Sequence, residues 1–373
     1  MADSVIAYVK NYGDYTFAEK PLNNVDSLVL CQLAYLKFDS LVPSPAQSRR
    51  AVSLHRVIMD KTFDAVFADK RYEEANRALF NAVLRSKRYG HLKMNYYVNY
   101  IDTERETQFS AITFFLENGP IYIAFRGTDE TLIGWKEDFN MAFQSPVPGQ
   151  QYAVEYLEDV AKRFSGGFCM GGHSKGGNFA VYAAMYCREN IRERILKVYS
   201  MDGPGFLPGV LNEGKYAGIE DRLIKILPRS STVGMMFETS TLCKVVESRS
   251  FGLFQHDPYT WLTEGDDFLY VKGIYGSRRF TDDTLNAWIS SLNEENRKFL
   301  IDTVYRVISA SGAENLMELA AEWKKSVAGM LSGLRTVDAE TRRIFLGLVK
   351  DFFKTAAKRL KSIYSIRKGG KEA

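Results

Sequence analysis

A serine flanked by glycines is the feature of this sequence most suited to chemistry. Residues 172–177 read Gly-His-Ser-Lys-Gly-Gly, which matches the pattern G-x-S-x-G around Ser174. An apolar stretch that predicts a short strand precedes this motif, and a stretch with a helical period follows it. This setting is that of a nucleophile elbow, in which the serine hydroxyl is exposed and the helix N-terminus favours developing negative charge. We therefore predict that Ser174 is a nucleophile. The glycines that leave room for the neighbouring backbone are Gly172, Gly176 and Gly177.

A serine nucleophile needs a base, and after an elbow of this kind the acid and the histidine follow the serine along the chain. The histidines of the sequence are His55, His91, His173 and His256. The first two precede Ser174, and His173 adjoins it on a sharp turn, where neighbouring side chains are expected to diverge. Elimination therefore predicts His256 as the base.

The acid is expected between the serine and the histidine. The candidates considered there are Asp202, Glu213, Glu220, Asp221, Glu238 and Glu247. Asp202 directly follows the predicted strand 195–201 and precedes a glycine, at the carboxyl end of a strand, where active-site groups of open α/β sheets collect. The stretch after the next predicted strand, 228–233, has no carboxylate. We predict Asp202 as the acid. Asp257 stays an alternative, although its place directly after the histidine in the chain disfavours it.

An oxyanion formed at the serine needs two hydrogen-bond donors. One is expected from the backbone N–H of the residue after the nucleophile, which is Lys175. The other is expected from the loop after an earlier strand. The sequence Phe-Arg-Gly-Thr at 125–128 follows the predicted strand 121–125, which makes Thr128 the second candidate donor. The alternative is that these residues form a simple turn at the end of a strand.

The elements that must position these residues alternate between strands and helices. Residues 109–116 and 121–125 predict a β-hairpin, and residues 195–201 and 223–227 predict further strands. Residues 45–93 look mostly helical, and a helix over 26–38 is expected to start with Asp26 as its N-cap. The alternation predicts an α/β fold with a largely parallel sheet.

The composition of the chain bounds the class of protein. The 373 residues are 46% hydrophobic and 25% charged, which excludes a disordered or fibrous protein. The four cysteines are too widely spaced for a zinc or redox motif, and no metal or organic cofactor is implied. No apolar run reaches the length of a membrane-spanning helix, and the first residues lack the pattern of a secretory signal. We therefore expect a cytoplasmic protein.

Positive charge is concentrated at the end of the chain. The net charge is +4, but residues 341–373 carry +8 and residues 1–340 carry −4. The acidic balance of the larger part gives no reason to expect a nucleic-acid partner. We expect a domain over 1–280 and a helical segment over 281–373. The basic, amphipathic tail of that segment could lie on an anionic membrane, or it could pack on its own protein, which is the commoner arrangement.

The motifs together resemble a known family. Phe-Arg-Gly-Thr at 125–128, Trp-Lys-Glu-Asp at 135–138 and Gly-His-Ser-Lys-Gly-Gly at 172–177 resemble the class 3, fungal-type lipases of the α/β-hydrolase fold. The chain resembles more closely a bacterial family of lipase-like proteins of unknown function, from about Phe17 to residues 255–261. The resemblance implies Ser174 as nucleophile, His256 as base, and Thr128 with Lys175 at the oxyanion hole.

The sequence departs from the class 3 pattern at the acid. Those lipases usually carry it after the later strand, where this chain has Ser230 and Ser231. Asp202 would place the acid one strand earlier, an arrangement that resembles pancreatic-type lipases.

The predicted function is that of a serine hydrolase acting on an acyl ester or lipid through an acyl-enzyme intermediate. The same residues would serve a thioesterase or a peptidase. A further alternative is a binding or scaffold protein that keeps the hydrolase fold without catalysis. The sequence leaves the oligomeric state open.

Overall fold

The computed structural model describes residues 2–69, 72–129, 132–141, 144–207, 210, 213–237, 243–273, 288–289, 291–309, 339, 341–344, 346–347 and 350. Contacts divide the chain into two units: Met1–Glu137 with Pro146–Ile274, and Asp138–Ser145 with Tyr275–Ala373. The expected domain boundary at residue 281 lies outside the described residues and stays a prediction. Most of the basic tail also lies outside them.

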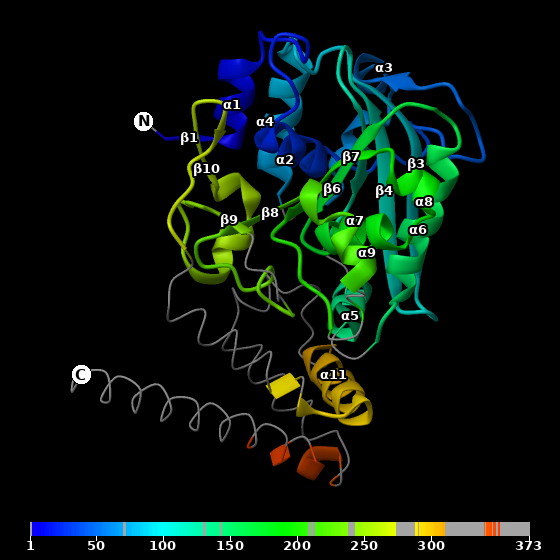
Figure 1. The fold of residues 1–373 in the computed structure, drawn as a ribbon, viewed down its shortest axis with the longest axis vertical. Coiled ribbons are helices and arrows are strands. Elements are labelled where there is room, and N and C mark those ends of the chain that lie inside the picture. Colours follow the sequence, from blue (N-terminus) through cyan, green and yellow to red (C-terminus); the bar gives the residue numbers. More distant parts are fainter. Residues whose placement is uncertain are drawn as a thin grey trace, which may run out of the picture. The chain divides into compact units, whose positions relative to one another are not determined.

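Among the described residues, an eight-stranded sheet forms the centre of the first unit (Figure 1). Its strands follow in the order β2 (Val52–Ser53), β3 (Lys93–Asp102), β4 (Thr107–Phe115), β5 (Ile121–Phe125), β6 (Phe168–His173), β7 (Ile195–Met201), β8 (Leu223–Pro228) and β9 (Cys243–Val246). β2 to β5 pair antiparallel, and β5 to β9 pair parallel. The predicted hairpin of β4 and β5 and the largely parallel sheet are therefore confirmed.

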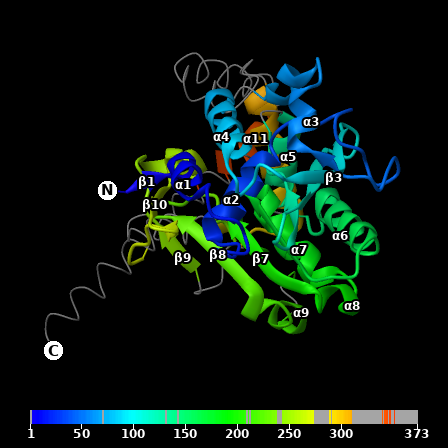
Figure 2. The same cartoon turned by 90° about the horizontal axis from the view of Figure 1, so that it is seen from above.

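Helices cover both faces of this sheet (Figures 1 and 2). The helices of the first unit are α1 (Val5–Tyr12), α2 (Asn24–Leu33), α3 (Leu54–Ile58), α4 (Glu73–Arg85), α5 (Leu132–Asn140, which runs on into the second unit), α6 (Pro148–Ala161), α7 (Lys175–Tyr186), α8 (Glu189–Arg192) and α9 (Glu213–Ala217). On one face, Ser27 of α2 bonds the hydroxyl of Tyr122 on β5, at 2.5 Å. On the other face, Phe109 of β4 packs on Phe179 of α7. The sheet therefore presents side chains to two separate helical layers.

Smaller elements complete the description. In the described part of the chain, β1 (Asp3–Ser4), β10 (Leu262–Glu264) and β11 (Asp267–Phe268) form a second, antiparallel sheet. Short 3-10 helices lie at η1 (Phe63–Phe67), η2 (Glu220–Arg222), η3 (Gly252–His256) and η4 (Pro258–Thr260). In the second unit, α11 covers Glu294–Ser309. No helix among the described residues is both long enough and apolar enough to cross a membrane.

Two expectations about the N-terminal region are corrected. α2 begins at Asn24, so its N-cap is Asn23 rather than Asp26. Asp26 is the third helical residue and completes a capping box, because its carboxylate accepts the backbone N–H of Asn23 at 2.9 Å. Residues 45–93 are less helical than expected. They contain α3, η1 and α4, but also β2 and extended loops.

Asp26 is also the centre of a buried polar cluster. Its carboxylate accepts hydrogen bonds from Arg88 Nε at 2.8 Å and from the hydroxyls of Tyr8 and Tyr89. Both partners of the Asp26–Arg88 ion pair are almost completely buried. The cluster connects the N-terminal helices α1 and α2 to the turn that follows α4.

Asp26→Ala should lower the unfolding free energy by about 3–5 kcal/mol, because it leaves the Arg88 charge buried without its carboxylate. Asp266→Ala is the matched control, since Asp266 pairs with Lys20 on the surface, and it should cost less than about 1 kcal/mol. Urea denaturation of the two variants measures both losses. Equal losses would contradict the assignment of Asp26 as a buried anchor.

Candidate active site

Ser174 lies between the end of β6 and the start of α7. Its backbone has φ 58° and ψ −133°, a conformation that non-glycine residues rarely adopt. Two hydrogen bonds hold this geometry: Ser174 N–H donates to the carbonyl of Met201 at 2.9 Å, and the Ser174 carbonyl accepts from Gly177 N–H at 2.9 Å. The serine is therefore held on a strained turn by the neighbouring strand and by its own helix.

The predicted elbow glycines are required by close backbone packing. A Cβ at Gly172 would overlap the backbone of Gly176, and a Cβ at Gly176 would overlap the carbonyl of Phe125 at the end of β5. A Cβ at Gly177 would meet the Ser200 hydroxyl at 2.9 Å. The motif therefore lets three segments of backbone approach one another beside the serine.

The three predicted side chains lie in one hydrogen-bonded series. Ser174 Oγ is 3.0 Å from His256 Nε2, and His256 Nδ1 is 2.6 Å from Asp202 Oδ2. Asp202 is fully buried, whereas the side chain of His256 keeps 22% of its exposure. In the neutral tautomer that this series requires, Nδ1–H donates to the carboxylate and Nε2 accepts from the serine hydroxyl.

Asp202 is held on the turn after β7. It has φ 50°, and its N–H donates to the carbonyl of Ile226 on β8 at 2.8 Å. Its Oδ1 accepts from the Ser231 hydroxyl at 2.5 Å and from Gly234 N–H at 3.2 Å. These donors leave Oδ2 directed at His256. Where class 3 lipases usually carry the acid, this chain therefore has a serine that donates to an acid from the preceding strand.

The loop that carries His256 is fixed by its neighbour Gln255. The Gln255 side chain accepts from Ser230 N–H at 2.6 Å and donates to the Ser250 carbonyl at 2.8 Å. Its backbone carbonyl accepts from the indole of Trp261 at 2.8 Å. The alternative acid, Asp257, instead caps η4 by accepting from Tyr259 N–H.

His173 lies closer to the site than its sequence position predicts. Its ring centroid is 4.7 Å from that of His256, and its Nε2 is 3.0 Å from the His256 carbonyl oxygen. A carbonyl only accepts, so Nε2 carries the proton, and Nδ1 accepts from the Tyr35 hydroxyl at 3.1 Å. His173 is thus a support of the His256 loop. The sequence did not predict this contact, because side chains of adjacent residues on a sharp turn are expected to diverge.

The segment that follows β5 runs beside the elbow. A Cβ at Gly127 would lie 3.1 Å from Ser174 Cβ and 2.6 Å from the His173 carbonyl. Thr128, next in the chain, is buried. Lys175 is the first residue of α7, a position whose N–H has no acceptor within the helix. The two predicted oxyanion donors thus belong to the two segments that adjoin the serine.

Lys225 is a buried cation close to the same carboxylate. It lies on β8 and is 7% exposed. Burial lowers the pKa of its ammonium group to about 8, and the nearby Asp202 carboxylate opposes this change. Among the described residues, no group of three or more histidine, cysteine or carboxylate side chains is arranged to hold a metal ion.

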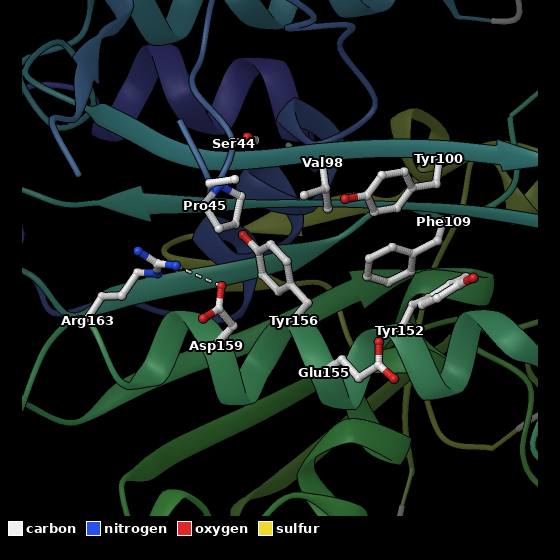
Figure 3. A pocket seen from close by; sticks show the side chains of 11 residues that line it. Ser44, Pro45, Val98, Tyr100, Phe109, Tyr152, Glu155, Tyr156, Asp159 and Arg163 are labelled. Carbon is white, nitrogen blue, oxygen red and sulfur yellow. Dashed lines mark hydrogen bonds and ion pairs between the residues drawn. The ribbon is translucent and has the colours of Figure 1, made fainter. Parts of the chain in front are cut away.

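A cavity of about 320 Å³ lies between α6 and the strands β3 and β4 (Figure 3). Aromatic side chains form much of its wall, among them Tyr100, Phe109, Tyr152 and Tyr156. None of its lining residues belongs to the series of serine, histidine and aspartate. The cavity is therefore separate from this series.

The parallel sheet, its helices and the elbow after β6 place this chain in the α/β-hydrolase fold class, as the sequence predicted. The family model described as Mbeg1-like matches residues 83–306. The chain therefore belongs to the Mbeg1-like family, a lipase-like family of unknown function, which confirms the expected family. A solved structure described as "Crystal structure of M37 lipase" is similar at 13% identity, covering 56% of this chain and 68% of that chain, with a TM-score of 0.35. No curated protein matches.

Gly176→Ala should lower the unfolding free energy by about 1–3 kcal/mol, because its Cβ meets backbone atoms that cannot move aside. Gly166→Ala is the matched control, because a Cβ at Gly166 meets nothing within 4 Å. Chemical denaturation compares the two. A Gly176 variant as stable as the Gly166 variant would show that the elbow is not closely packed.

Lys225→Met should change how stability depends on pH. The folded pKa of Lys225, about 8, lies below its unfolded value, so the unfolded chain binds more protons between these values and stability rises with pH there. Relative to the variant, the wild type should gain about 2 kcal/mol between pH 7 and pH 9.5. Urea denaturation at both pH values measures this gain. Lys197 lies on an exposed part of β7 and provides the control: relative to Lys197→Met, the wild type should gain no stability between the two pH values.

Proposed function

We propose that this protein is a serine hydrolase that cleaves a carboxylic ester. The observation that carries the proposal is the series from Ser174 Oγ through the His256 imidazole to the Asp202 carboxylate, with contacts of 3.0 Å and 2.6 Å. A serine, a histidine and a buried carboxylate in this order and spacing activate a hydroxyl for attack on an acyl carbon. Membership of a lipase-like family supports the same chemistry.

In the proposed reaction, His256 Nε2 takes the proton of the Ser174 hydroxyl while Oγ bonds to the ester carbonyl carbon. Asp202 holds the imidazole in its tautomer and stabilises the imidazolium that forms. Collapse of the tetrahedral intermediate breaks the bond to the alcohol, which leaves with the proton from His256. Water then attacks the acyl-enzyme through the same base and releases the acid.

The oxyanion of the intermediate is proposed to bind the backbone N–H groups of Thr128 and Lys175. Support comes from the position of Gly127 against Ser174 and from the place of Lys175 at the N-terminus of α7. The positive end of the helix dipole would add to the stabilisation of negative charge there.

An apolar acyl group is the favoured substrate class. Phe251 directly precedes the 3-10 helix that ends at His256, and Phe254 belongs to this helix. The two residues are 77% and 50% exposed, and their rings lie 5.8 Å apart. Exposed phenyl rings beside a reaction site favour contact with an apolar ligand. The membrane contact predicted for the basic tail would suit such a substrate and stays a prediction.

Labelling by a fluorophosphonate probe tests the proposal. The wild type should be labelled, Ser174→Ala should lose all labelling, and His256→Ala and Asp202→Asn should react at least about 100-fold more slowly, because the hydroxyl is no longer activated. Hydrolysis of p-nitrophenyl esters of graded chain length gives the matching rates. Ser231→Ala is the milder variant, since it removes a donor to Asp202 and leaves the series intact.

The contradicting outcome is a folded wild type that neither reacts with the probe nor hydrolyses any ester. That result would favour a binding or scaffold protein with a hydrolase fold. Faster turnover of acyl thioesters than of matched oxygen esters would instead assign the same residues to a thioesterase.

A further inference from the structure

The side chain of Lys175, the residue after the proposed nucleophile, is fully buried. Its Nζ lies 2.9 Å from Glu137 Oε2, 3.2 Å from Gln108 Oε1 and 3.3 Å from the carbonyl oxygen of Gly134. An ammonium group has three N–H donors, so these acceptors use all of them. The charge is thus enclosed in a complete set of partners.

Glu137 is equally enclosed. Its side chain is fully buried, its Oε1 accepts from Gly149 N–H at 2.9 Å, and its Oε2 also accepts from Gln108 N–H at 3.1 Å. The Lys175–Glu137 pair therefore connects the start of α7, strand β4, helix α5 and the first turn of α6.

Stability alone does not account for such a pair. Removing two charges from water costs several kcal/mol for each ion, and an apolar pair of similar volume is often as stable or more so. Saturated polar partners do enforce a single geometry, because any displacement leaves a buried charge or dipole without a partner.

The geometry enforced here is that of the proposed oxyanion hole. One donor is the backbone N–H of Lys175 itself. The other belongs to Thr128, whose neighbour Asp129 is held by Lys37 at 3.0 Å and by Arg126 at 3.4 Å. Two residues that follow Thr128 in the chain are thus held by ion pairs: Asp129 directly after it, and Glu137 on α5.

We propose that the Lys175 side chain and Glu137 are positioning residues, which hold the oxyanion donors where negative charge develops. This inference rests on the proposed ester hydrolysis. Donors that are placed in advance stabilise the transition state without reorganisation, so their displacement lowers kcat and leaves substrate binding unchanged.

The test uses the double variant Lys175→Met/Glu137→Gln in the full chain. The amide introduced by Glu137→Gln has one acceptor oxygen, which can accept from Gly149 N–H or from Gln108 N–H, so one of these two backbone hydrogen bonds is lost. The variant thus removes both charges and leaves no ion alone in the core. Lys20→Met, at an exposed ion pair, is the matched control.

The double variant should melt within a few degrees of the wild type, the difference that one lost hydrogen bond accounts for, while its kcat for a p-nitrophenyl ester falls about 10- to 100-fold with KM unchanged. Its affinity for a trifluoromethyl ketone, whose adduct with the serine carries an oxyanion, should fall by the same factor as kcat/KM. Lys20→Met should match the wild type in all these measurements.

Each other outcome overturns the proposal in a recognisable way. If the wild type neither hydrolyses the ester nor binds the ketone, the proposed function fails and this inference fails with it. If the wild type is active and the double variant has the wild-type kcat, the pair has no positioning role. The same conclusion follows if only KM rises in the double variant. A double variant that melts well below the wild type would make the pair a stability element instead.

Discussion

The alignment of the carboxyl ends of β6, β7 and β8 is the constraint on which the site depends. Ser174 follows β6 and donates its N–H to Met201, the last residue of β7. Asp202 follows β7 and donates its N–H to Ile226 of β8. The hydrogen bonding between parallel strands thus continues one residue past the end of β6 and of β7. Ser174 and Asp202 are these residues, and each donates its N–H to the neighbouring strand. Both residues take positive φ there, because the ladder fixes their backbone while the chain turns away.

The histidine is positioned by side chains rather than by the sheet. Gln255, Trp261 and His173 fix the backbone around His256, and Asp202 orients its ring. The Ser231 hydroxyl and Gly234 N–H in turn hold the carboxylate. The proposed role of His256 as a base needs a fixed ring orientation, and these contacts supply it from three separate segments.

Two buried ion pairs of the described residues lie at junctions between elements. The Asp26–Arg88 pair joins the N-terminal helices to the turn after α4, and the Lys175–Glu137 pair joins the elbow to α5 and α6. In both pairs the remaining donors and acceptors are also used, which limits the cost of removing the charges from water. The polar contacts therefore specify how elements meet, while the apolar core provides most of the favourable free energy.

Local patterns in the chain were enough to predict the sheet, the elbow and the three residues of the series. Apolar strands, glycine spacing and chain order are such patterns, and backbone physics interprets them directly. They were not enough for the N-cap of α2, where Asn23 and Asp26 are both suitable and the packing of Asp26 on Arg88 decides between them. Nor did they predict the contact of His173 with His256 or the burial of Lys175 against Glu137. Those partners are 83 and 38 residues apart along the chain, so it is the tertiary fold that brings them together.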